Sequence, residues 1–323
     1  MKVRQTPREL KRRLDHNVEI NFKTSPIVHS ILRPYIRSFL YLDNDLNSYT
    51  YSWIDWTRKV SNNKYICIPG LGSTKPFHTY SSSFCVDLNA LPAGVQAIPL
   101  KILDRVDNEH NNISEWGLEQ FQNHYSDKKI TKDDIFYYTY GVLHNPAYRK
   151  KYEQNLKREF PRLPFYEDFH QWAKWGKALM DLHIGYEEVE PFEVDRKDLE
   201  LKVKGADQER LFKDGTVDPM FAVKGKLKVK LKADKEEGII YLDELTSLHG
   251  IPSEAWEYKL GNRSALEWIL DQYKEKKPKD KTIAEKFNTY RFADYKEHVI
   301  DLLKRVCTVS VETMKVIREM EKI

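Results

Sequence analysis

The sequence predicts an α+β fold in which a small β-rich N-terminal half packs on a larger, mainly helical C-terminal half with a lysine-rich strand pair. Short runs of β-branched and aromatic residues, bounded by turn residues, occupy the first part of the chain. Apolar residues then recur at helical spacing in residues 131–187, and lysine alternates with apolar residues in residues 221–233. A polar, asparagine-rich segment separates the halves. We expect residues 1–125 and 126–323 to form one domain together.

Helix signals are clearest in residues 131–187. Thr131 and Asp134 have the spacing of a capping box, in which two side chains satisfy backbone amides at a helix start. Asn145-Pro146 ends this helix, because a proline disfavours helical backbone in the residue before it. Ser264 and Glu267 form a second capping-box pattern, and residues 294–320 predict a closing amphipathic helix or pair of helices. Apolar side chains on the inward faces of three helices would form a hub rich in tyrosine and tryptophan: Ile135, Phe136, Val142, Leu143, Tyr148, Tyr152, Leu156, Phe169, Trp172, Leu179 and Leu182.

Strand-like runs lie at residues 18–22, 38–42, 65–68 and 84–88. In residues 221–233 the alternation places one set of side chains on each face of a strand. Lysines on one face would lie about 6.7 Å apart, a spacing comparable to that of phosphates along a DNA strand. Lysines on an edge strand also prevent aggregation, and both interpretations stay open. The lysine face comprises Lys226, Lys228, Lys230 and Lys232, and the apolar face comprises Leu227, Val229 and Leu231.

Composition indicates a globular protein that we expect in the cytoplasm. Hydrophobic residues make up 41% and charged residues 32% of the 323 residues, with no apolar run near the length of a membrane span and no signal-peptide pattern. Cys67, Cys85 and Cys307 are far apart and lack metal-ligand spacing, so we expect reduced thiols. The net charge of +4 permits a polyanionic partner, but a DNA-binding face would have to be a local patch.

Several segments of the chain resemble the C-terminal target recognition domain of type ISP restriction-modification enzymes. The strongest likeness is the run IFYYTYGVLHNPAYRKKYEQNLKREFPRLPF, followed by ALMDLHIGYE. It continues in LRPYIRSFLYLD, PGLGSTKPF, VQAIPL and IPSEAWEYKLGNRSALEWILDQY. Tyr35 stands where the family usually has Phe, and Lys101 where it has an aromatic residue; both are read as adjustments of local packing.

The resemblance implies a single-chain bacterial enzyme with nuclease, helicase-like ATPase and adenine-N6 methyltransferase domains, followed by a domain that reads the DNA site. This chain would be only that last domain. Its partners would be double-stranded DNA and the methyltransferase and helicase-nuclease domains of the same enzyme. S-adenosylmethionine, ATP and Mg²⁺ would belong to the upstream domains, and no catalytic or metal site is expected in this chain. Whether the chain is a natural protein or an excised domain stays open.

Candidate DNA contacts lie on loops and on the lysine face. In residues 70–75, Gly70 and Gly72 would let backbone amides approach a phosphate and Lys75 would add charge, although a tight turn explains the glycines equally well. The spacing of a Walker A loop is missing. Bases are read by polar side chains, with Asn and Gln pairing to adenine and Arg and Lys to guanine. The candidates are Trp56, Arg58, Asn62, Asn63, Lys64, Gly70, Gly72, Ser73, Thr74, Lys75, His78, Ser81, Lys226, Lys228 and Lys230.

Two patterns resemble catalytic motifs, of a methyltransferase and of a nuclease, but we do not expect either activity in this chain. Asn145-Pro146-Ala147-Tyr148 is one substitution from the Asn-Pro-Pro-Tyr signature of adenine methyltransferases, but residues on both sides have helical spacing. Asp243 with Glu257 and Lys259 imitates metal-dependent nucleases, which require a strand where we expect a turn or short helix.

The histidines show no metal-ligand pair, and we expect His144 and His183 to be hydrogen-bonded core residues.

Two alternative functions stay open. One is an Mg²⁺-dependent nuclease domain that uses Asp243 and Glu257. The other is a module that docks onto a methyltransferase without binding DNA.

Overall fold

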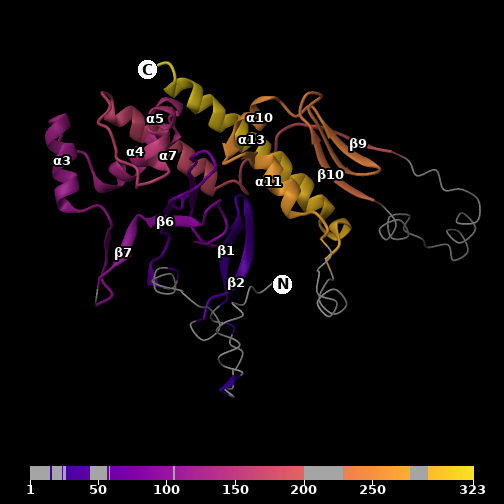
Figure 1. Cartoon of the computed structure of the whole chain (residues 1–323), viewed down its shortest axis with the longest axis horizontal. Helices are drawn as coiled ribbons and strands as arrows, with labels where there is room; N and C mark the ends of the chain where they lie inside the picture. The colour runs from indigo at the N-terminus through magenta and orange to yellow at the C-terminus, as the bar shows by residue number, and fades with distance from the viewer. Residues whose placement is uncertain are drawn as a thin grey trace, which may run out of the picture. The chain divides into compact units, whose positions relative to one another are not determined.

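The computed structural model describes residues 15–16, 24, 27–43, 57, 59–104, 106–199, 228–276 and 290–323. Helices and small sheets both occur, which confirms the α+β class (Figure 1). Spatial contacts divide the chain into two compact units. Unit 1 comprises residues 1–186, 259–262 and 315–323, and unit 2 comprises residues 187–258 and 263–314. This division does not test the boundary expected between residues 125 and 126, which stays a prediction.

Unit 1 begins with short strands in small sheets. One sheet has the order β2-β1-β5, with β1 antiparallel to β2 and parallel to β5. A second has the order β4-β3-β6, and β7 pairs with β8. The runs expected at 38–42, 65–68 and 84–88 overlap β2, β3 and β5, whereas residues 18–22 lie outside the described residues. The strands are β1 (Ile27–Arg33), β2 (Ile36–Tyr41), β3 (Tyr65–Pro69), β4 (Tyr80–Ser82), β5 (Cys85–Val86), β6 (Val95–Pro99), β7 (Lys101–Leu103), β8 (Glu109–Asn111) and β13 (Lys259–Leu260).

Three helices of unit 1, α4, α5 and α7, begin where the sequence predicts, whereas α3 lies in the polar segment for which no helix was expected. Thr131 and Asp134 form the expected capping box, with the Thr131 hydroxyl accepting from the Asp134 amide at 3.1 Å and the Asp134 carboxylate accepting from the Thr131 amide at 2.9 Å. The expected second helix divides into two short ones at Tyr152. The helices are α3 (Glu115–Tyr125), α4 (Lys132–His144), α5 (Pro146–Lys151), α6 (Glu153–Leu156) and α7 (Phe169–Ile184).

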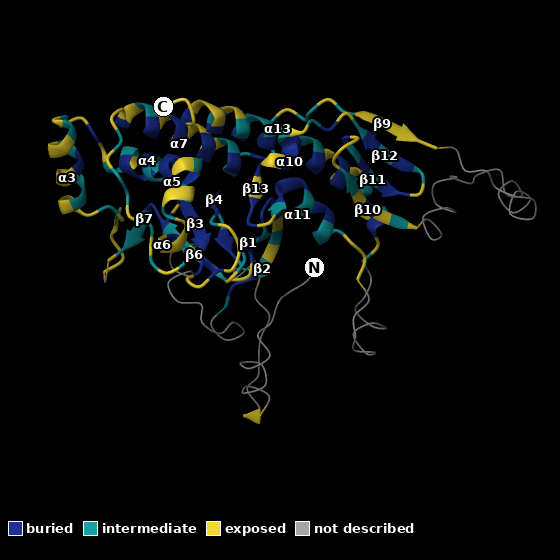
Figure 2. Ribbon diagram, turned by 45° about the horizontal axis from the view of Figure 1, so that its top comes forward, coloured by how far each residue is buried: buried dark blue, intermediate teal, exposed yellow. Residues whose placement is uncertain are grey.

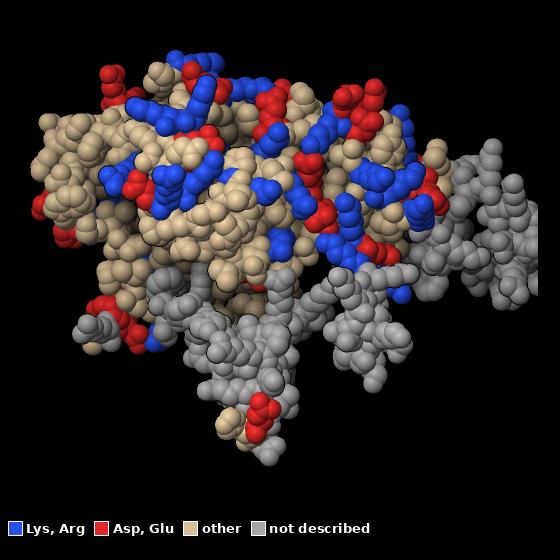
Figure 3. Space-filling model, in the orientation of Figure 1, with Lys and Arg blue, Asp and Glu red and all other residues tan. Residues whose placement is uncertain are grey.

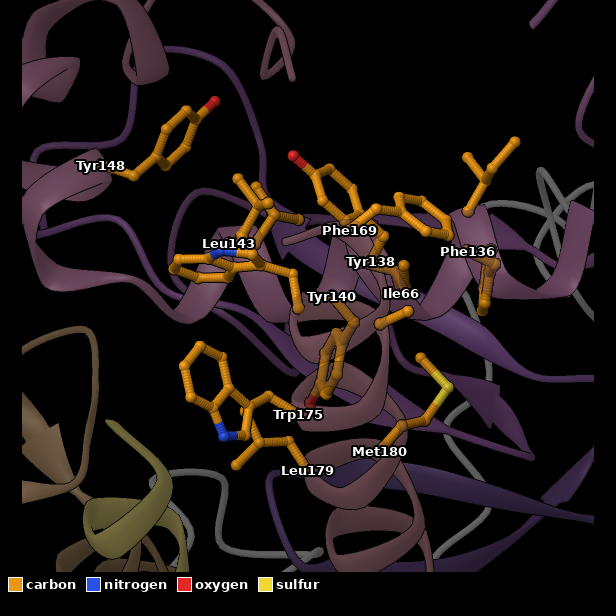
Figure 4. Close-up of a cluster of buried hydrophobic side chains, with 14 of the residues drawn as sticks. Ile66, Phe136, Tyr138, Tyr140, Leu143, Tyr148, Phe169, Trp175, Leu179 and Met180 are labelled. Carbon is orange, nitrogen blue, oxygen red and sulfur yellow. The ribbon is translucent and has the colours of Figure 1, made fainter. Parts of the chain in front are cut away.

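The core of unit 1 is the aromatic hub formed mainly by α4 and α7 (Figure 4). Tyr138 stacks on Phe169 with ring centroids 5.0 Å apart. Buried tyrosine hydroxyls need hydrogen-bond partners. Those of Tyr138 and Tyr148 donate to the carbonyls of Pro164 at 2.6 Å and Arg162 at 2.9 Å. These bonds hold residues 161–166 against the hub.

Unit 2 is built on a four-stranded antiparallel sheet in the order β10-β11-β12-β9. The lysine-rich strand therefore belongs to a sheet larger than the expected strand pair. The sequence did not predict β9, because its polar sequence DRKD gives no strand signal. Ser264 and Glu267 form the second expected capping box. The elements are β9 (Asp195–Asp198), β10 (Val229–Asp234), β11 (Ile239–Asp243), β12 (Thr246–His249), α10 (Glu254–Glu257), β14 (Arg263–Ser264), α11 (Ala265–Gln272) and η2 (Phe292–Tyr295).

The closing helix α13 (Lys296–Met320) is one continuous helix, and its residues from 315 onward belong to unit 1. Its predicted apolar stripe is confirmed by buried residues such as Val299, Leu303 and Val306. The described helices include none that combines the length and the apolar character needed to cross a membrane.

Candidate nucleic-acid interface

The turn before β3 carries three predicted contacts, of which Asn62 and Asn63 differ most in exposure. Asn62 is exposed and has left-handed backbone, with φ of 51°. Asn63 is buried, and its Oδ1 accepts from the amides of Lys64 at 3.0 Å and Lys101 at 3.1 Å. Its Nδ2 donates to the Lys101 carbonyl at 2.9 Å. Asn63 thus ties β7 to the turn, whereas Asn62 presents its side chain to solvent.

Lys64 is half-buried and already partnered. Its Nζ donates to the Tyr137 hydroxyl at 3.0 Å and lies 3.4 Å from Asp181 Oδ1. Burial alone would lower the pKa of Lys64, but the hydrogen bond to Tyr137 and the Asp181 carboxylate outweigh it and raise that pKa. A DNA phosphate would therefore compete with Asp181 for this ammonium group.

The loop of residues 70–75 uses both glycine amides within the protein. The Gly70 amide donates to the Gly94 carbonyl at 2.8 Å, and the Gly72 amide donates to the Lys157 carbonyl at 2.7 Å. Gly72 has φ of 81°, a conformation that favours glycine. Ser73 is buried, and its hydroxyl accepts from the Lys75 amide. A phosphate at this loop would therefore meet mainly the exposed side chains of Thr74 and Lys75.

His78 and Ser81 lie inside unit 1 and are fully buried. His78 Nδ1 lies 2.9 Å from the Pro76 carbonyl, which only accepts, so Nδ1 carries the proton. Its Nε2 has no hydrogen-bond partner among the described residues. Burial lowers the pKa of His78 to about 4. Among the predicted contacts in residues 62–81, Asn62, Thr74 and Lys75 are the most accessible to DNA, and the roles of the others stay predictions.

The predicted lysines are exposed in the described part of the segment, but the strict alternation does not hold along β10. Lys228, Lys230 and Lys232 are exposed and Leu231 is buried. The alternation includes a bulge that the sequence did not predict, since the pairing register shifts between Val229 and Lys232 and Leu231 has φ of 42°. Three predicted contacts, Trp56, Arg58 and Lys226, lie outside the described residues.

The sheet extends the lysine face into a row across all its strands. Lys232 pairs with Tyr241, Tyr241 pairs with Ser247, and Ser247 pairs with Lys197. Directly paired residues share one face of a sheet, so this row spans about 14 Å at a strand spacing of about 4.8 Å. Lys230 Nζ lies 5.7 Å from the centre of the Tyr241 ring. The exposed face of the sheet therefore presents cations on both sides of an aromatic ring.

The methyltransferase-like motif lies between two helices, as predicted, and its Asn145 caps the second of them. Asn145 Oδ1 accepts from the amides of Ala147 at 2.8 Å and Tyr148 at 3.3 Å, and Pro146 is the first residue of α5. The Tyr148 ring is buried. The side chains that would hold a flipped adenine in a methyltransferase are thus engaged within the hub.

The nuclease-like residues also have structural partners. Asp243 Oδ2 lies 2.8 Å from Lys296 Nζ, and its Oδ1 accepts from the amides of Leu245 at 2.9 Å and Thr246 at 2.8 Å. Glu257 ends the short helix α10, which confirms the expected context. Within the described ranges, no group of three or more His, Cys, Asp or Glu residues is arranged to hold a metal ion.

His144 and His183 are core residues, as predicted. Both are fully buried; His144 Nδ1 lies 2.8 Å from the Tyr140 carbonyl, and His183 Nδ1 lies 2.6 Å from the Tyr140 hydroxyl. Burial lowers the pKa of His183 to about 3 and also lowers that of His144, to which the Arg149 charge contributes. Both imidazoles are therefore neutral in the folded protein at physiological pH.

The accessible candidates are mainly lysines, with Asn62 and Thr74, on loops and on a sheet face, and side chains of these kinds occur in nucleic-acid-binding modules. Figure 3 shows Lys and Arg interspersed with Asp and Glu on the face in view. Residues 3–302 match the family described as the type ISP C-terminal specificity domain. The chain belongs to this family. No curated protein matches it.

Solved structures of related enzymes are similar over nearly the whole chain. The DrdV–DNA complex has a TM-score of 0.85 and 42% identity, covering 97% of this chain and 30% of its own. A nuclease-deletion mutant of the type ISP restriction-modification enzyme LlaGI, in complex with a DNA substrate mimic, has a TM-score of 0.71 and 27% identity over 98% of this chain and 26% of its own. The ATP-dependent type ISP enzyme LlaBIII bound to DNA shares the fold, with a TM-score of 0.69 and 24% identity over 98% of this chain and 20% of its own. This chain thus spans less than a third of each of these enzymes.

Sequence reasoning missed the contributions of Lys197, Tyr241 and Ser247 to the exposed sheet face. Only strand register places them beside Lys232, and residues this far apart along the chain carry no local signal of it. The hydrogen bond that joins Gly72 to Lys157 was likewise invisible in the sequence.

Proposed function

We propose that this chain binds double-stranded DNA at a specific sequence, as the specificity domain of a type ISP restriction-modification enzyme. It positions the DNA for adenine-N6 methylation and ATP-dependent restriction by the methyltransferase and helicase-nuclease domains of the same enzyme. S-adenosylmethionine, ATP and Mg²⁺ would bind to those domains.

The similarity to the DrdV–DNA complex is the observation that carries this proposal. It extends over 97% of the chain at 42% identity, so it includes both units. The family match over residues 3–302 supports the same conclusion. Neither the fold nor the family by itself identifies the DNA sequence that would be read.

The exposed polar residues suit two kinds of DNA contact. Cations such as Lys75, Lys228 and Lys230 fit the phosphate backbone, which positions a protein without reading sequence. Asn62 and Thr74 carry the donors and acceptors that read base edges, and they lie on exposed loops. Arg58 and Lys226 are further candidates outside the described residues.

A titration of the 323-residue chain with a pool of random duplexes at two salt concentrations, followed by sequencing of the retained DNA, tests the proposal. We expect weak binding that falls steeply as salt rises, because phosphate contacts release counterions. A retained pool enriched in one sequence supports specific recognition by the chain.

Two results would favour other functions. Absence of binding even at low salt would favour a module that docks onto a methyltransferase. Mg²⁺-dependent cutting that an Asp243→Asn change abolishes would favour a nuclease.

A further inference from the structure

Basic side chains are exposed at the end of α5, just after α6 and on the loop of residues 70–75. Figure 2 shows exposed residues on α5. Lys150 and Lys151 end α5, Arg158 follows α6, and Lys75 lies on the loop. All four side chains are exposed, and none forms an ion pair with another residue that the structure describes. They are therefore cations available to an external anion.

A backbone hydrogen bond joins the loop to the helices. The Gly72 amide donates to the Lys157 carbonyl at 2.7 Å, which places the loop beside the end of α6. Lys75 and Arg158 thus lie close to the two ends of this connection, although they are far apart in the sequence. The loop and the two helices form one surface, which we call the α5–α6 surface.

The acidic residues on the α5–α6 surface are already neutralised. Lys157 Nζ lies 2.7 Å from Glu153, and Arg162 lies 2.9 Å from Glu159. A hydrogen bond from Asn155 and the charge of Arg162 lower the pKa of Glu159. Because each carboxylate has its own cation, Lys75, Lys150, Lys151 and Arg158 leave the surface with a local excess of positive charge.

Helix stability explains only part of this charge. Cations near a helix C-terminus interact favourably with the helix dipole. Arg149 fills such a role, since its Nε donates to the Leu143 carbonyl in the last turn of α4 at 2.6 Å. Lys150 and Lys151 make no hydrogen bond of this kind to a described residue; Lys151 Nζ instead lies 5.3 Å from the centre of the Tyr152 ring.

The hub holds the α5–α6 surface in place. Tyr148 of α5 and Leu156 of α6 are buried in the hub, and the Tyr148 hydroxyl bonds to the segment that follows α6. A surface that is ordered before binding loses less entropy when a ligand arrives. Two exposed apolar side chains, Leu71 at 53% and Phe160 at 54%, flank the cations and are suited to contact sugars or bases.

We propose that the α5–α6 surface binds the phosphate backbone of duplex DNA through Lys75, Lys150, Lys151 and Arg158. This inference rests on the proposed function and adds to it the part of the chain that supplies sequence-independent affinity. A duplex is favoured over a small anion because the cations lie on the loop, at the end of α5 and just after α6 instead of on one segment.

The test compares two fourfold variants of the 323-residue chain by duplex titration across a salt series. One replaces Lys75, Lys150, Lys151 and Arg158 with Gln. The control replaces four other exposed residues of unit 1 that form no ion pair with a described residue, Lys129, Lys174, Lys259 and Lys322, with Gln. Each phosphate contact contributes about 0.9 to the slope of log K against log salt, so the first variant should flatten the slope by about 3.6 and the control by much less.

Three outcomes separate this inference from the proposed function. If both variants bind DNA with equal slopes of log K against log salt, the α5–α6 surface does not bind phosphates, and the proposed DNA binding by the chain is unaffected. Absence of binding by the unmodified chain would overturn both. If the fourfold variant unfolds, a double variant with Lys150→Gln and Lys151→Gln replaces it. Its slope should be flatter by about 1.8, and an unchanged slope would show that the α5–α6 surface does not bind phosphates.

Discussion

Gly141 and Gly176 face each other where α4 crosses α7. A Cβ atom on Gly176 would lie 1.7 Å from the Tyr137 carbonyl oxygen and 2.8 Å from the Gly141 amide nitrogen. A Cβ atom on Gly141 would lie 2.6 Å from the Trp172 carbonyl oxygen. The two backbones therefore meet without side chains between them, and this crossing determines how the hub that carries α5 is assembled.

The change Gly176→Ala should destabilise unit 1 strongly. The added methyl group overlaps backbone atoms, which cannot move aside as a flexible side chain can, so we expect a loss on the order of 3 kcal/mol in the free energy of unfolding. Urea unfolding followed by tryptophan fluorescence measures it. Gly117→Ala is the control, because its nearest new contact is the Ser114 hydroxyl at 3.3 Å. Similar stability of the two variants would show that the helices cross less tightly.

The buried histidines predict sensitivity to acid. The pKa of His78 is lowered to about 4 and that of His183 to about 3, whereas both protonate near pH 6.5 when unfolded. Below pH 6.5 the unfolded chain therefore binds more protons than the folded one. The free energy of unfolding should fall as pH decreases from 6.5 toward 4, by up to about 1.4 kcal/mol per pH unit for each histidine. Urea unfolding at pH values from 7.5 to 5 measures this slope.

The change His144→Asn should reduce that pH slope. Asparagine can still donate to the Tyr140 carbonyl but does not titrate, so one proton is removed from the linkage. Stability at pH 7.5 should also decrease, because the smaller side chain leaves a cavity. His124→Asn, at an exposed position, serves as the control. An equal slope in His144→Asn would mean that His144 does not contribute.

Breaking the Asp243–Lys296 pair should destabilise unit 2. Both side chains are largely buried, with exposed fractions of 4% and 12%, so Asp243→Asn leaves a charged Lys296 without its partner. We expect a loss on the order of 3 kcal/mol in the free energy of unfolding, partly restored by adding Lys296→Met. Asp301→Asn, which breaks an exposed pair with Arg305, should cost less than about 1 kcal/mol. Equal losses would show that burial does not strengthen the first pair.

Local features of this chain were predictable from sequence. The capping boxes at Thr131 and Ser264 depend on residues three apart, so their pattern is visible directly. The helical context of Asn145 and the inward position of His144 follow from the same short-range periodicity. Predictions of this kind succeed because helix geometry relates near neighbours in the chain.

Long-range pairings account for what the sequence could not predict. The row from Lys232 to Lys197 depends on strand register, and β9 has no apolar residue to indicate a strand. The glycines at 70 and 72 suggested amides open to a phosphate, but their partners, Gly94 and Lys157, lie far along the chain. The predicted contacts themselves were chosen by residue type, and only the structure shows that Asn63 is engaged internally while Asn62 is accessible.

Lys228, just before β10, and the two lysines of β10 offer a last prediction that separates two roles. If they bind phosphates, replacing Lys228, Lys230 and Lys232 with Gln should flatten the slope of log K against log salt by about 2.7 and leave sequence preference unchanged. If they protect the edge of the sheet, the same variant should keep its slope but aggregate at lower protein concentration, because β10 is an edge strand. Light scattering and a salt titration of the same sample distinguish these results. A variant that changes neither property would show that the lysine face serves neither role.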